Sequence, residues 1–389
     1  MAKTIDKYLE KTEALRRFPQ RNDTYKRAYR RDPPMEQAAD RYYYTLRDPT
    51  TAHWKVPGRT LKDYAYAMGS YYVERNFARG HVTGNFGLLK WEEDPEEMAK
   101  ANRMKPIYKY EVKDPTAMSK DMKKAAKKLG ASQVGVCTLE PLWVYSEGYN
   151  PMTQEDFPIE IDFNVYKYAI VFVVEMDYEA MQSSPSHLEY ATVAYAYSRA
   201  AYVAGQMAHF IRTLGYKAIP SVNDTALNIP LAIDAGLGQL GRNGLLITPQ
   251  YGPRVRIGKI LTNLPLGVDK PISFGVPEFC NVCKRCAEKC PGGAIMSGDL
   301  TDRPLNISTS PGVFKWPVDG EKCFQFWGQS EMCCANCIRV CPFNKPQGWF
   351  HDTIRFVVKN APWFDRVIVW FDKLFSYGKR VGADRFWED

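Results

Sequence analysis

The chain has 389 residues, of which 45% are hydrophobic and 25% charged, and its net charge is +8. This size and composition are typical of a globular protein with a substantial core. They exclude a membrane-spanning protein, because no apolar run reaches the roughly eighteen residues that cross a bilayer. The basic residues are scattered and no recognition motif accompanies them, so we expect no nucleic-acid partner.

Residues 1–114 are rich in tyrosine, arginine and proline and have weak periodicity. We expect this N-terminal region to wrap around the core as short helices and irregular segments. An Arg16-Arg17 pair lies near its start, but the apolar segment of a signal peptide does not follow it. We therefore expect either a cytoplasmic protein or a mature chain whose leader has been removed.

Residues 115–275 have the alternating pattern of an α/β domain. The expected helices are Met118 to Leu129, Leu188 to Leu214 and Ala226 to Ala235, with Gly130 and Gly215 ending the first two. The expected strands are Gln133 to Leu139, Tyr168 to Glu175, Lys217 to Ile219, Leu245 to Thr248 and Val255 to Thr262. The strand from Tyr168 is expected at the centre of the sheet, and the last two strands are expected to complete it.

Residues 276–346 contain two cysteine runs. The first is Cys280, Cys283, Cys286 and Cys290 before Pro291, and the second is Cys334, Cys337 and Cys341 before Pro342, with Cys323 upstream. C-x2-C-x2-C-x3-C-P is a bacterial ferredoxin run for a four-iron cluster, and in paired runs the fourth cysteine of each ligates the other cluster. The sequence therefore predicts a ferredoxin-like electron-transfer module with two [4Fe-4S] clusters.

The crossed pattern assigns ligands to each cluster. The first cluster takes Cys280, Cys283, Cys286 and Cys341, and the second takes Cys290, Cys323, Cys334 and Cys337. Cys333 competes with Cys334, but only Cys334 gives the two-residue gap to Cys337. Zinc and disulfides are the alternatives, and two complete runs that end in proline suit them less well. Cys137 lies in an apolar stretch and is expected to be a buried core thiol.

Residues 347–389 form the last predicted segment. From Thr353 to Tyr377, aromatic and charged residues alternate at helical spacing, which predicts an amphipathic helical segment. Two interpretations stay open: the segment packs back onto the domain, or it contacts a membrane surface or a partner.

Gly236, Gly238 and Gly241 fit the G-x-G-x-x-G pattern of a dinucleotide site. That pattern requires a strand before it and a helix after it. Here the preceding residues are predicted to be helical, and the following ones turn into a strand, so we do not expect NAD or FAD. A glycine-rich turn still lets the backbone approach a large flat ligand closely.

Three sequence blocks, with the two four-iron runs after them, closely resemble the respiratory reductive dehalogenases. The blocks are Ser221 to Leu227, Asp234 to Pro249 and Tyr251 to Arg256. The resemblance implies a nitroreductase-like α/β (α+β) domain that holds a cobalamin-type corrinoid, to which the clusters pass electrons. The motif D-x-H-x-x-G, which supplies a cobalt ligand in another corrinoid class, is absent, in agreement with a base-off corrinoid. The expected corrinoid contacts are Gly236, Gly238, Gly241, Arg242 and Asn243.

The resemblance also implies the catalytic residues: Tyr197 donates the proton, and Asn223 and Arg256 hold it. A phenol, whose reference pKa is about 10, stays protonated at neutral pH, and a neighbouring guanidinium stabilises the phenolate that forms. Taken singly, each residue has a plain structural interpretation: a core tyrosine, a helix cap and half of an ion pair. The three residues gain weight only as a set.

The leading hypothesis is therefore reductive dehalogenation of a small organohalide, with chlorinated aliphatics favoured. A related enzyme, epoxyqueuosine reductase, and a non-catalytic electron or corrinoid carrier are the alternatives. The first would require a carboxylic acid at the matched position of Tyr197, and the second leaves the three residues unused. The resemblance further implies an upstream electron donor, a small membrane-anchor protein and a location on the outer face of the cytoplasmic membrane.

Overall fold

A four-stranded antiparallel sheet forms the centre of the protein in this computed structural model, which describes residues 11–45, 56–78, 109–151 and 153–388. The strand order is β1 (Gln133–Thr138), β4 (Tyr168–Glu175), β8 (Val255–Thr262) and β5 (Ala218–Ser221). The prediction of a mixed helix-and-strand fold is confirmed. Because every pairing in this sheet is antiparallel, the α+β description applies.

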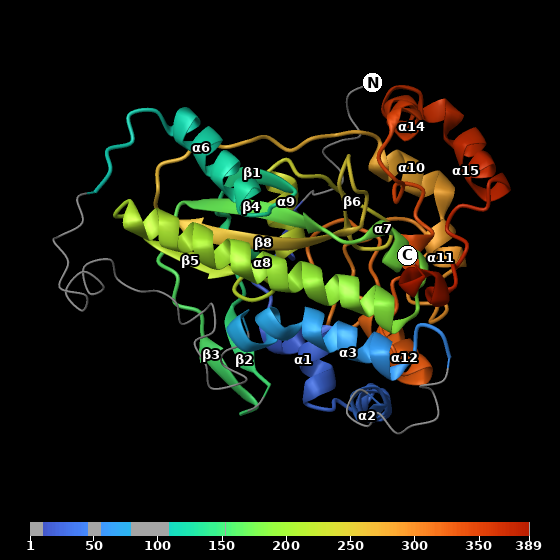
Figure 1. Ribbon diagram of the computed structural model, residues 1–389. Helices are drawn as coiled ribbons and strands as arrows, with labels where there is room; N and C mark the ends of the chain where they lie inside the picture. The colour runs from blue at the N-terminus through green and yellow to red at the C-terminus, as the bar shows by residue number, and fades with distance from the viewer. Residues whose placement is uncertain (1–10, 46–55, 79–108, 152, 389) are drawn as a thin grey trace.

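Strand β4 is central because its side chains are apolar on both faces. Ile170, Phe172 and Val174 pack on one face with helix α8 (His187–Thr213), whereas Ala169 and the alternate residues pack on the other face. That second face is covered by α9 (Asn228–Asp234). The sheet is thus enclosed between two apolar layers, and α8 runs along one of them (Figure 1).

Helix α8 is long and has clear end signals. The Ser186 side chain accepts a hydrogen bond from the Glu189 backbone N–H at its start, and Gly215 takes a positive φ of 83° just after its end. Helix α6 (Pro115–Lys128) similarly starts with an Asp114 cap and a proline in its first turn. The sequence predicted both helices to within a few residues.

One strand prediction is wrong in its placement. The segment from Leu245 to Thr248 does not join the main sheet; it contains β7 (Leu246–Ile247), which pairs with β6 (Gln239–Leu240) in a separate hairpin. Strands of two residues carry no periodicity that could show their partner. The G-x-G-x-x-G pattern follows helix α9 and lies on this hairpin, so its rejection as a Rossmann fingerprint is confirmed.

The described parts of residues 1–114 lie against two other helices. Helix α3 (Leu61–Ser70) lies beside α8, as Figure 1 shows, while α1 (Thr24–Tyr29) and α2 (Glu36–Thr45) lie beside α12 (Gly320–Ser330). The contact with α12 is an aromatic cluster around Tyr42 and Phe324. The remaining residues of 1–114 lie outside the described part of the chain. The division of the chain into regions 1–114, 115–275, 276–346 and 347–389 stays a prediction.

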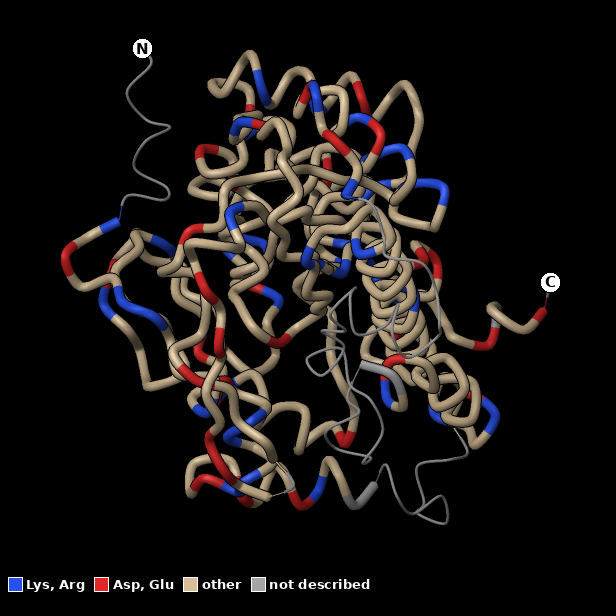
Figure 2. The backbone as a smooth tube through the Cα atoms, turned by 90° about the vertical axis from the view of Figure 1, so that its left-hand side faces the viewer, with Lys and Arg blue, Asp and Glu red and all other residues tan. Residues whose placement is uncertain are grey.

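The cysteine-rich part contains α10 (Val276–Cys283), α11 (Arg285–Glu288), α12 and α13 (Asn336–Arg339). Fully buried Arg254, next to β8, donates from Nε to the Asn344 side-chain oxygen at 3.0 Å and so ties this part to the sheet. Basic and acidic residues are interspersed over the described backbone (Figure 2). In the described part of the chain, no helix has both the length and the apolar composition needed to cross a membrane.

The C-terminal segment forms two helices instead of one. Helix α14 (Trp349–Asn360) ends before Pro362, and α15 (Asp365–Leu374) begins three residues after that proline. Proline cannot continue the hydrogen-bond ladder of α14, which explains the break. Both helices are amphipathic and pack on α10 (Figure 1), so the predicted packing onto the domain is confirmed.

Candidate redox and proton-donor site

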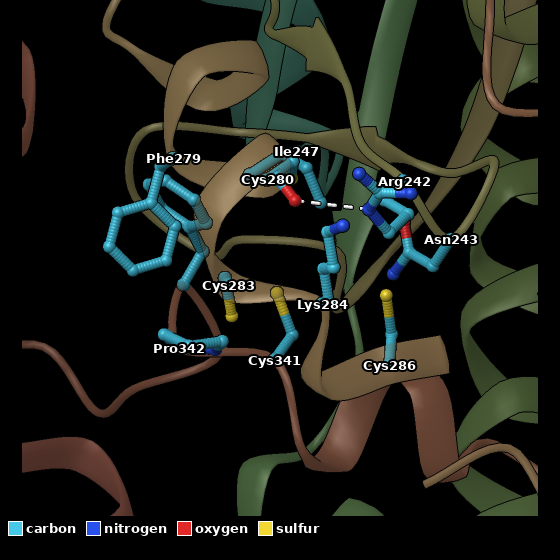
Figure 3. A pocket seen from close by; sticks show the side chains of 11 residues that line it. Arg242, Asn243, Ile247, Phe279, Cys280, Cys283, Lys284, Cys286, Cys341 and Pro342 are labelled. Carbon is cyan, nitrogen blue, oxygen red and sulfur yellow. Dashed lines mark hydrogen bonds between the residues drawn. The ribbon is translucent and has the colours of Figure 1, made fainter. Parts of the chain in front are cut away.

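Three closely spaced cysteines and a fourth that is distant in the sequence line one pocket. They are Cys280 and Cys283 of α10, Cys286 of α11 and Cys341 after α13, and the side chains of Arg242, Asn243 and Phe279 complete the wall (Figure 3). Lys284 adopts a left-handed conformation, with φ of 51°, between α10 and α11. This reversal turns the two short helices so that cysteines from both reach the same space. The set is the one that the crossed ligand pattern predicts for the first cluster.

Arg242 forms part of this pocket and fixes its shape. Its Nε donates to the Cys280 carbonyl oxygen at 3.0 Å, and Nη1 donates to the carbonyl oxygens of Met296 and Gly298, both at 2.8 Å. The guanidinium also lies 4.3 Å from the Trp316 ring centre. Arg242 therefore joins α10 to the loop that follows the first cysteine run.

The second cysteine set is Cys290, Cys323, Cys334 and Cys337. Their thiols interact electrostatically with one another, and Cys337 interacts as well with Cys286 of the first set. Burial raises the pKa of the Cys334 and Cys323 thiols to about 12. Without a bound cation these thiols stay neutral, whereas iron favours the thiolate form. The two sets thus lie next to each other, with Cys286 and Cys337 as the link.

The side chain of Cys333 contacts a different part of the protein from that of Cys334. Its Sγ donates to the Glu189 carboxylate at 3.9 Å, on helix α8. Glu189 also accepts a hydrogen bond from the Ser184 hydroxyl at 3.4 Å, and burial raises the pKa of its carboxyl group to about 7. Cys333 is therefore a contact of α8, although its thiol also lies near that of Cys334.

Tyr197 and Arg256 lie together between α8 and β8. The Arg256 guanidinium is 4.9 Å from the Tyr197 ring centre, within cation–π range. The Arg256 Nε is buried and has no hydrogen-bond partner. The strand holds Arg256 in place, because it pairs with Val174 of the central strand. A half-buried phenol and a half-buried guanidinium, whose buried Nε has no partner, are thus adjacent on rigid elements.

Tyr25 of helix α1 borders the same site, although no sequence pattern predicted it there. It interacts electrostatically with Tyr197, Arg256 and Cys323. The residue is 46% exposed, and its ring lies 5.4 Å from the Trp327 ring. The Asp23 side chain caps this helix, because it accepts hydrogen bonds from backbone N–H groups of the first turn. That cap says nothing about which surface the helix would face.

Asn223 lies in the loop after β5. The β5–β8 register pairs Ser221 with Lys259, so the chain beyond Ser221 runs toward the Arg256 end of β8. The Asn223 side-chain oxygen accepts a hydrogen bond from the Asn228 amide at 3.3 Å. Within the described residues, no hydrogen bond joins Asn223 to Tyr197 or to Arg256. The structure thus pairs two of the three predicted catalytic residues and leaves the third, exposed, in a neighbouring loop.

The predicted corrinoid contacts fall into two groups. The glycines shape the β6–β7 hairpin: a Cβ at Gly238 would lie 2.2 Å from the Ile247 carbonyl oxygen, and Gly236 has a φ of 72°. Arg242 and Asn243 line the first cysteine pocket. A corrinoid contact for these five residues stays a prediction.

Comparisons with known proteins agree with the cysteine pattern. Residues 279–345 match the 4Fe-4S dicluster domain family. A tetrachloroethene reductive dehalogenase of Desulfitobacterium hafniense is 38% identical over 335 residues, which are 77% of this chain and 60% of that protein. An epoxyqueuosine reductase of Listeria monocytogenes is 31% identical over 126 residues, which are 32% of each chain.

Solved structures extend the similarity to the fold. A structure described as suggesting a mechanism for B12-dependent dehalogenation has a TM-score of 0.75 and 26% identity, over 98% of this chain and 49% of that one. The catabolic reductive dehalogenase NpRdhA in complex with 3-bromo-4-hydroxybenzoic acid has a TM-score of 0.73 and 25% identity, over 96% of this chain and 48% of that one. This chain spans about half to three fifths of the length of these relatives. By sequence and by fold, it belongs to the reductive dehalogenase family.

Proposed function

We propose that this protein catalyses reductive dehalogenation, the replacement of a carbon-bound halogen by hydrogen. The observation that carries the proposal is the Tyr197–Arg256 pair beside the second cysteine set. A weak acid next to a source of electrons is what the reaction requires, since R–X, two electrons and one proton give R–H and a halide ion. An electron carrier without catalysis would have no use for the pair.

Two [4Fe-4S] clusters would supply the electrons. We assign the first to Cys280, Cys283, Cys286 and Cys341 and the second to Cys290, Cys323, Cys334 and Cys337. The support is the common pocket of the first set, the mutual electrostatic contacts of the second and the dicluster family match. The link between Cys286 and Cys337 supports transfer from one cluster to the other.

A base-off, cobalamin-type corrinoid is the second cofactor of the proposal. When bound, it would supply a cobalt centre that accepts electrons from the clusters and reacts with the carbon–halogen bond. The unpartnered Arg256 Nε fits this assignment, because a buried donor without a partner is costly unless a ligand satisfies it. The similarity to the structure described with B12-dependent dehalogenation also supports it.

The roles of the side chains follow from their chemistry. Tyr197 gives its phenolic proton to the carbon that loses the halogen, and solvent later restores it. Arg256 stabilises the phenolate, since its charge lies 4.9 Å from the ring. Asn223 is proposed to donate a hydrogen bond to the same oxygen or to the departing halide.

The substrate proposed is a small chlorinated aliphatic compound. The relative from Desulfitobacterium hafniense is named for tetrachloroethene, whereas the NpRdhA complex holds a bromo-hydroxybenzoate, so a halogenated phenol is the second class to test. We further propose an upstream electron donor, a small membrane-anchor partner and a location on the outer face of the cytoplasmic membrane, or in the cytoplasm if no leader exists. These last points rest on the family resemblance.

Halide release tests the proposal. Protein prepared without oxygen and loaded with cobalamin, iron and sulfide would receive titanium(III) citrate and a panel of chlorinated ethenes, alkanes and halophenols. We expect halide above a control with free cobalamin. Tyr197→Phe should lower turnover by about a hundredfold or more, because general acid catalysis contributes that much. Bound cobalt and iron should be unchanged.

Tyr195→Phe is the matched control, because Tyr195 lies on the same helix and is exposed. It should turn over like the wild-type protein. Undiminished activity of Tyr197→Phe would refute the proton-donor role. Absence of halide from the whole panel, with both metals bound, would favour epoxyqueuosine reduction or electron carriage instead.

A further inference from the structure

Helices α14 and α15, with the short turn Pro362–Phe364 between them, expose several large apolar side chains to the solvent. We define the C-terminal patch as Trp349, Phe356, Trp363, Trp370, Leu374 and Phe375, whose side chains are 58% to 80% exposed. Large apolar side chains that gather on one surface mark an interaction site more often than single ones do. Tryptophan in particular is enriched among the residues that dominate binding energy at interfaces.

The underside of the same two helices packs on the first cysteine set. Val358 of α14 and Ile368 and Val369 of α15 belong to one buried cluster with Cys283 and Cys341. The arrangement of the helices is consistent with this cluster, because α14 and α15 pack on α10 at one end of the molecule (Figure 1). The C-terminal patch is thus the outer face of the layer that covers the proposed first cluster.

Buried ion pairs hold this layer in place. Asp372 of α15 pairs with Arg285, which is next to Cys286, and with Lys345 at 2.5 Å. Arg285 donates in addition to the Tyr377 carbonyl oxygen at 2.7 Å, after the end of α15. The patch therefore sits on a fixed support, so a partner that binds there would be held at a defined position relative to the cysteines.

The two cysteine sets have different neighbours, which gives electron flow a direction. The second set is the one near the catalytic pair, because Cys323 interacts with Tyr25, which interacts with Tyr197. The first set lies near the second, because α11, which carries Cys286, packs on α13, which carries Cys337; it also shares a buried cluster with α14 and α15. Electrons that reach the catalytic pair from outside would then enter at the first set, beneath the C-terminal patch.

The charges around the patch suit an acidic partner. Exposed Lys359, Arg366 and Lys379 lie on or just after these helices, and Lys373 of α15 pairs with exposed Glu288 at 3.3 Å. The exposed acidic residue on α14 is Asp352. We propose that the C-terminal patch docks an acidic, one-electron carrier protein that reduces the first cluster. This inference rests on the proposed clusters. Each encounter would oxidise the carrier and reduce the cluster by one electron, so two encounters serve one turnover.

Rapid mixing of the cluster-loaded protein with a reduced, acidic flavodoxin tests the docking site. Loss of visible cluster absorbance gives the rate, and titanium(III) citrate serves as the small reductant that needs no docking. We expect the double variant Trp363→Ser, Trp370→Ser and the single variant Arg366→Glu to slow reduction by flavodoxin about tenfold or more. Reduction by titanium(III) citrate should not change, and salt should slow only the flavodoxin reaction.

Tyr110→Ser is the matched control, because Tyr110 is 52% exposed and hydrogen-bonds through its backbone to Leu214 at the end of α8. It should react like the wild-type protein. Equal flavodoxin rates for the patch variants and the wild type would overturn the inference and leave the proposed function standing. The same result with loss of binding to phosphatidylglycerol vesicles would assign the patch to a membrane. A chain that assembles no clusters would overturn both proposals.

Discussion

Buried charged side chains have different partners in two regions of this protein, the surroundings of the first cysteine set and those of the catalytic pair. Around the first cysteine set, Arg285 and Lys345 share the carboxylate of Asp372, and all three are buried. Near the catalytic pair, fully buried Lys259 has no ion-pair partner among the described residues. Lys259 donates instead to neutral oxygens, the Val222 carbonyl at 2.9 Å and the Asn228 side chain at 2.6 Å.

The difference indicates two purposes for buried charge. An ion pair with a buried partner on another element joins those elements, and removing one partner leaves a charge that cannot be solvated. A buried cation that bonds only to neutral groups orients them instead, because each acceptor must turn its oxygen toward the donor. The first arrangement attaches α15 to the cysteines; the second fixes the loop that carries Asn223.

The strongest test removes the shared carboxylate. Asp372→Asn would leave Arg285 and Lys345 buried without a counter-charge, and breaking such a pair costs about 3–5 kcal/mol. We expect the midpoint of urea unfolding, measured by tryptophan fluorescence, to fall strongly. We also expect a protease to cleave α15 earlier than in the wild-type protein. Asp352→Asn removes an exposed partner of Arg355 and should cost less than about 1 kcal/mol. Similar losses in the two variants would contradict the comparison.

The sequence predicted the cysteine half better than the catalytic half, for a physical reason. Ligand spacing is a local property, so Cys280, Cys283 and Cys286 could be grouped before their pocket was seen. Tyr197 and Arg256 are 59 positions apart, and only the resemblance joined them; their contact needs the packing of α8 on the sheet. Tyr25 was missed because a helix cap does not define what the helix faces.

The buried ion pairs could not be predicted from the sequence either. Asp372 follows the expected amphipathic spacing, yet nothing local assigns it to Arg285, 87 positions earlier. Pro362 was a usable signal for the break between α14 and α15, since proline ends a helix from its interior. Features that depend on neighbouring residues could thus be predicted from the sequence. Ion pairs between residues on different elements could be identified only from the structure.

The second test concerns the unpaired lysine. Burial lowers the pKa of the Lys259 ammonium to about 7, from an ordinary value of 10.5, and the charge of Asp224 opposes that shift. Between these two pH values the unfolded chain binds a proton that the folded chain does not. The free energy of unfolding should therefore rise with pH across this window, by at most about 1.4 kcal/mol per pH unit.

Lys259→Met removes the titrating group and should abolish this slope. The measurement is urea unfolding from pH 7 to 9.5 under anaerobic conditions, with slopes compared instead of absolute stabilities. Lys217→Met replaces an exposed lysine just before β5 and should keep the wild-type slope. A slope that survives in Lys259→Met would mean that another group titrates there.

The smallest expected effect concerns the orientation of Asn223. Because Lys259 donates to the Asn228 side-chain oxygen, the Asn228 amide nitrogen must face Val222 and the Asn223 oxygen, to which it donates at 2.7 and 3.3 Å. The Asn223 amide nitrogen then points away from Asn228 and is free to donate, which is its proposed role. Asn228→Asp keeps the oxygen that accepts from Lys259 but removes the amide that donates to Asn223. The Asn223 side chain should then turn its nitrogen toward the new carboxylate, so that this nitrogen can no longer donate to the phenol oxygen or to the halide.

We expect Asn228→Asp to lower kcat about tenfold with little change in KM, because the lost hydrogen bond acts mainly in the transition state. Stability should change little, since the new ion pair with Lys259 offsets the lost hydrogen bond to the Val222 carbonyl oxygen. Asn263→Asp is the control: the Asn263 side-chain oxygen accepts from the Lys217 backbone N–H at 2.8 Å, and aspartate preserves that bond. If Asn228→Asp were as active as Asn263→Asp, Lys259 would serve only to hold the loop, and the distinction between joining and orienting charges would be lost at this site.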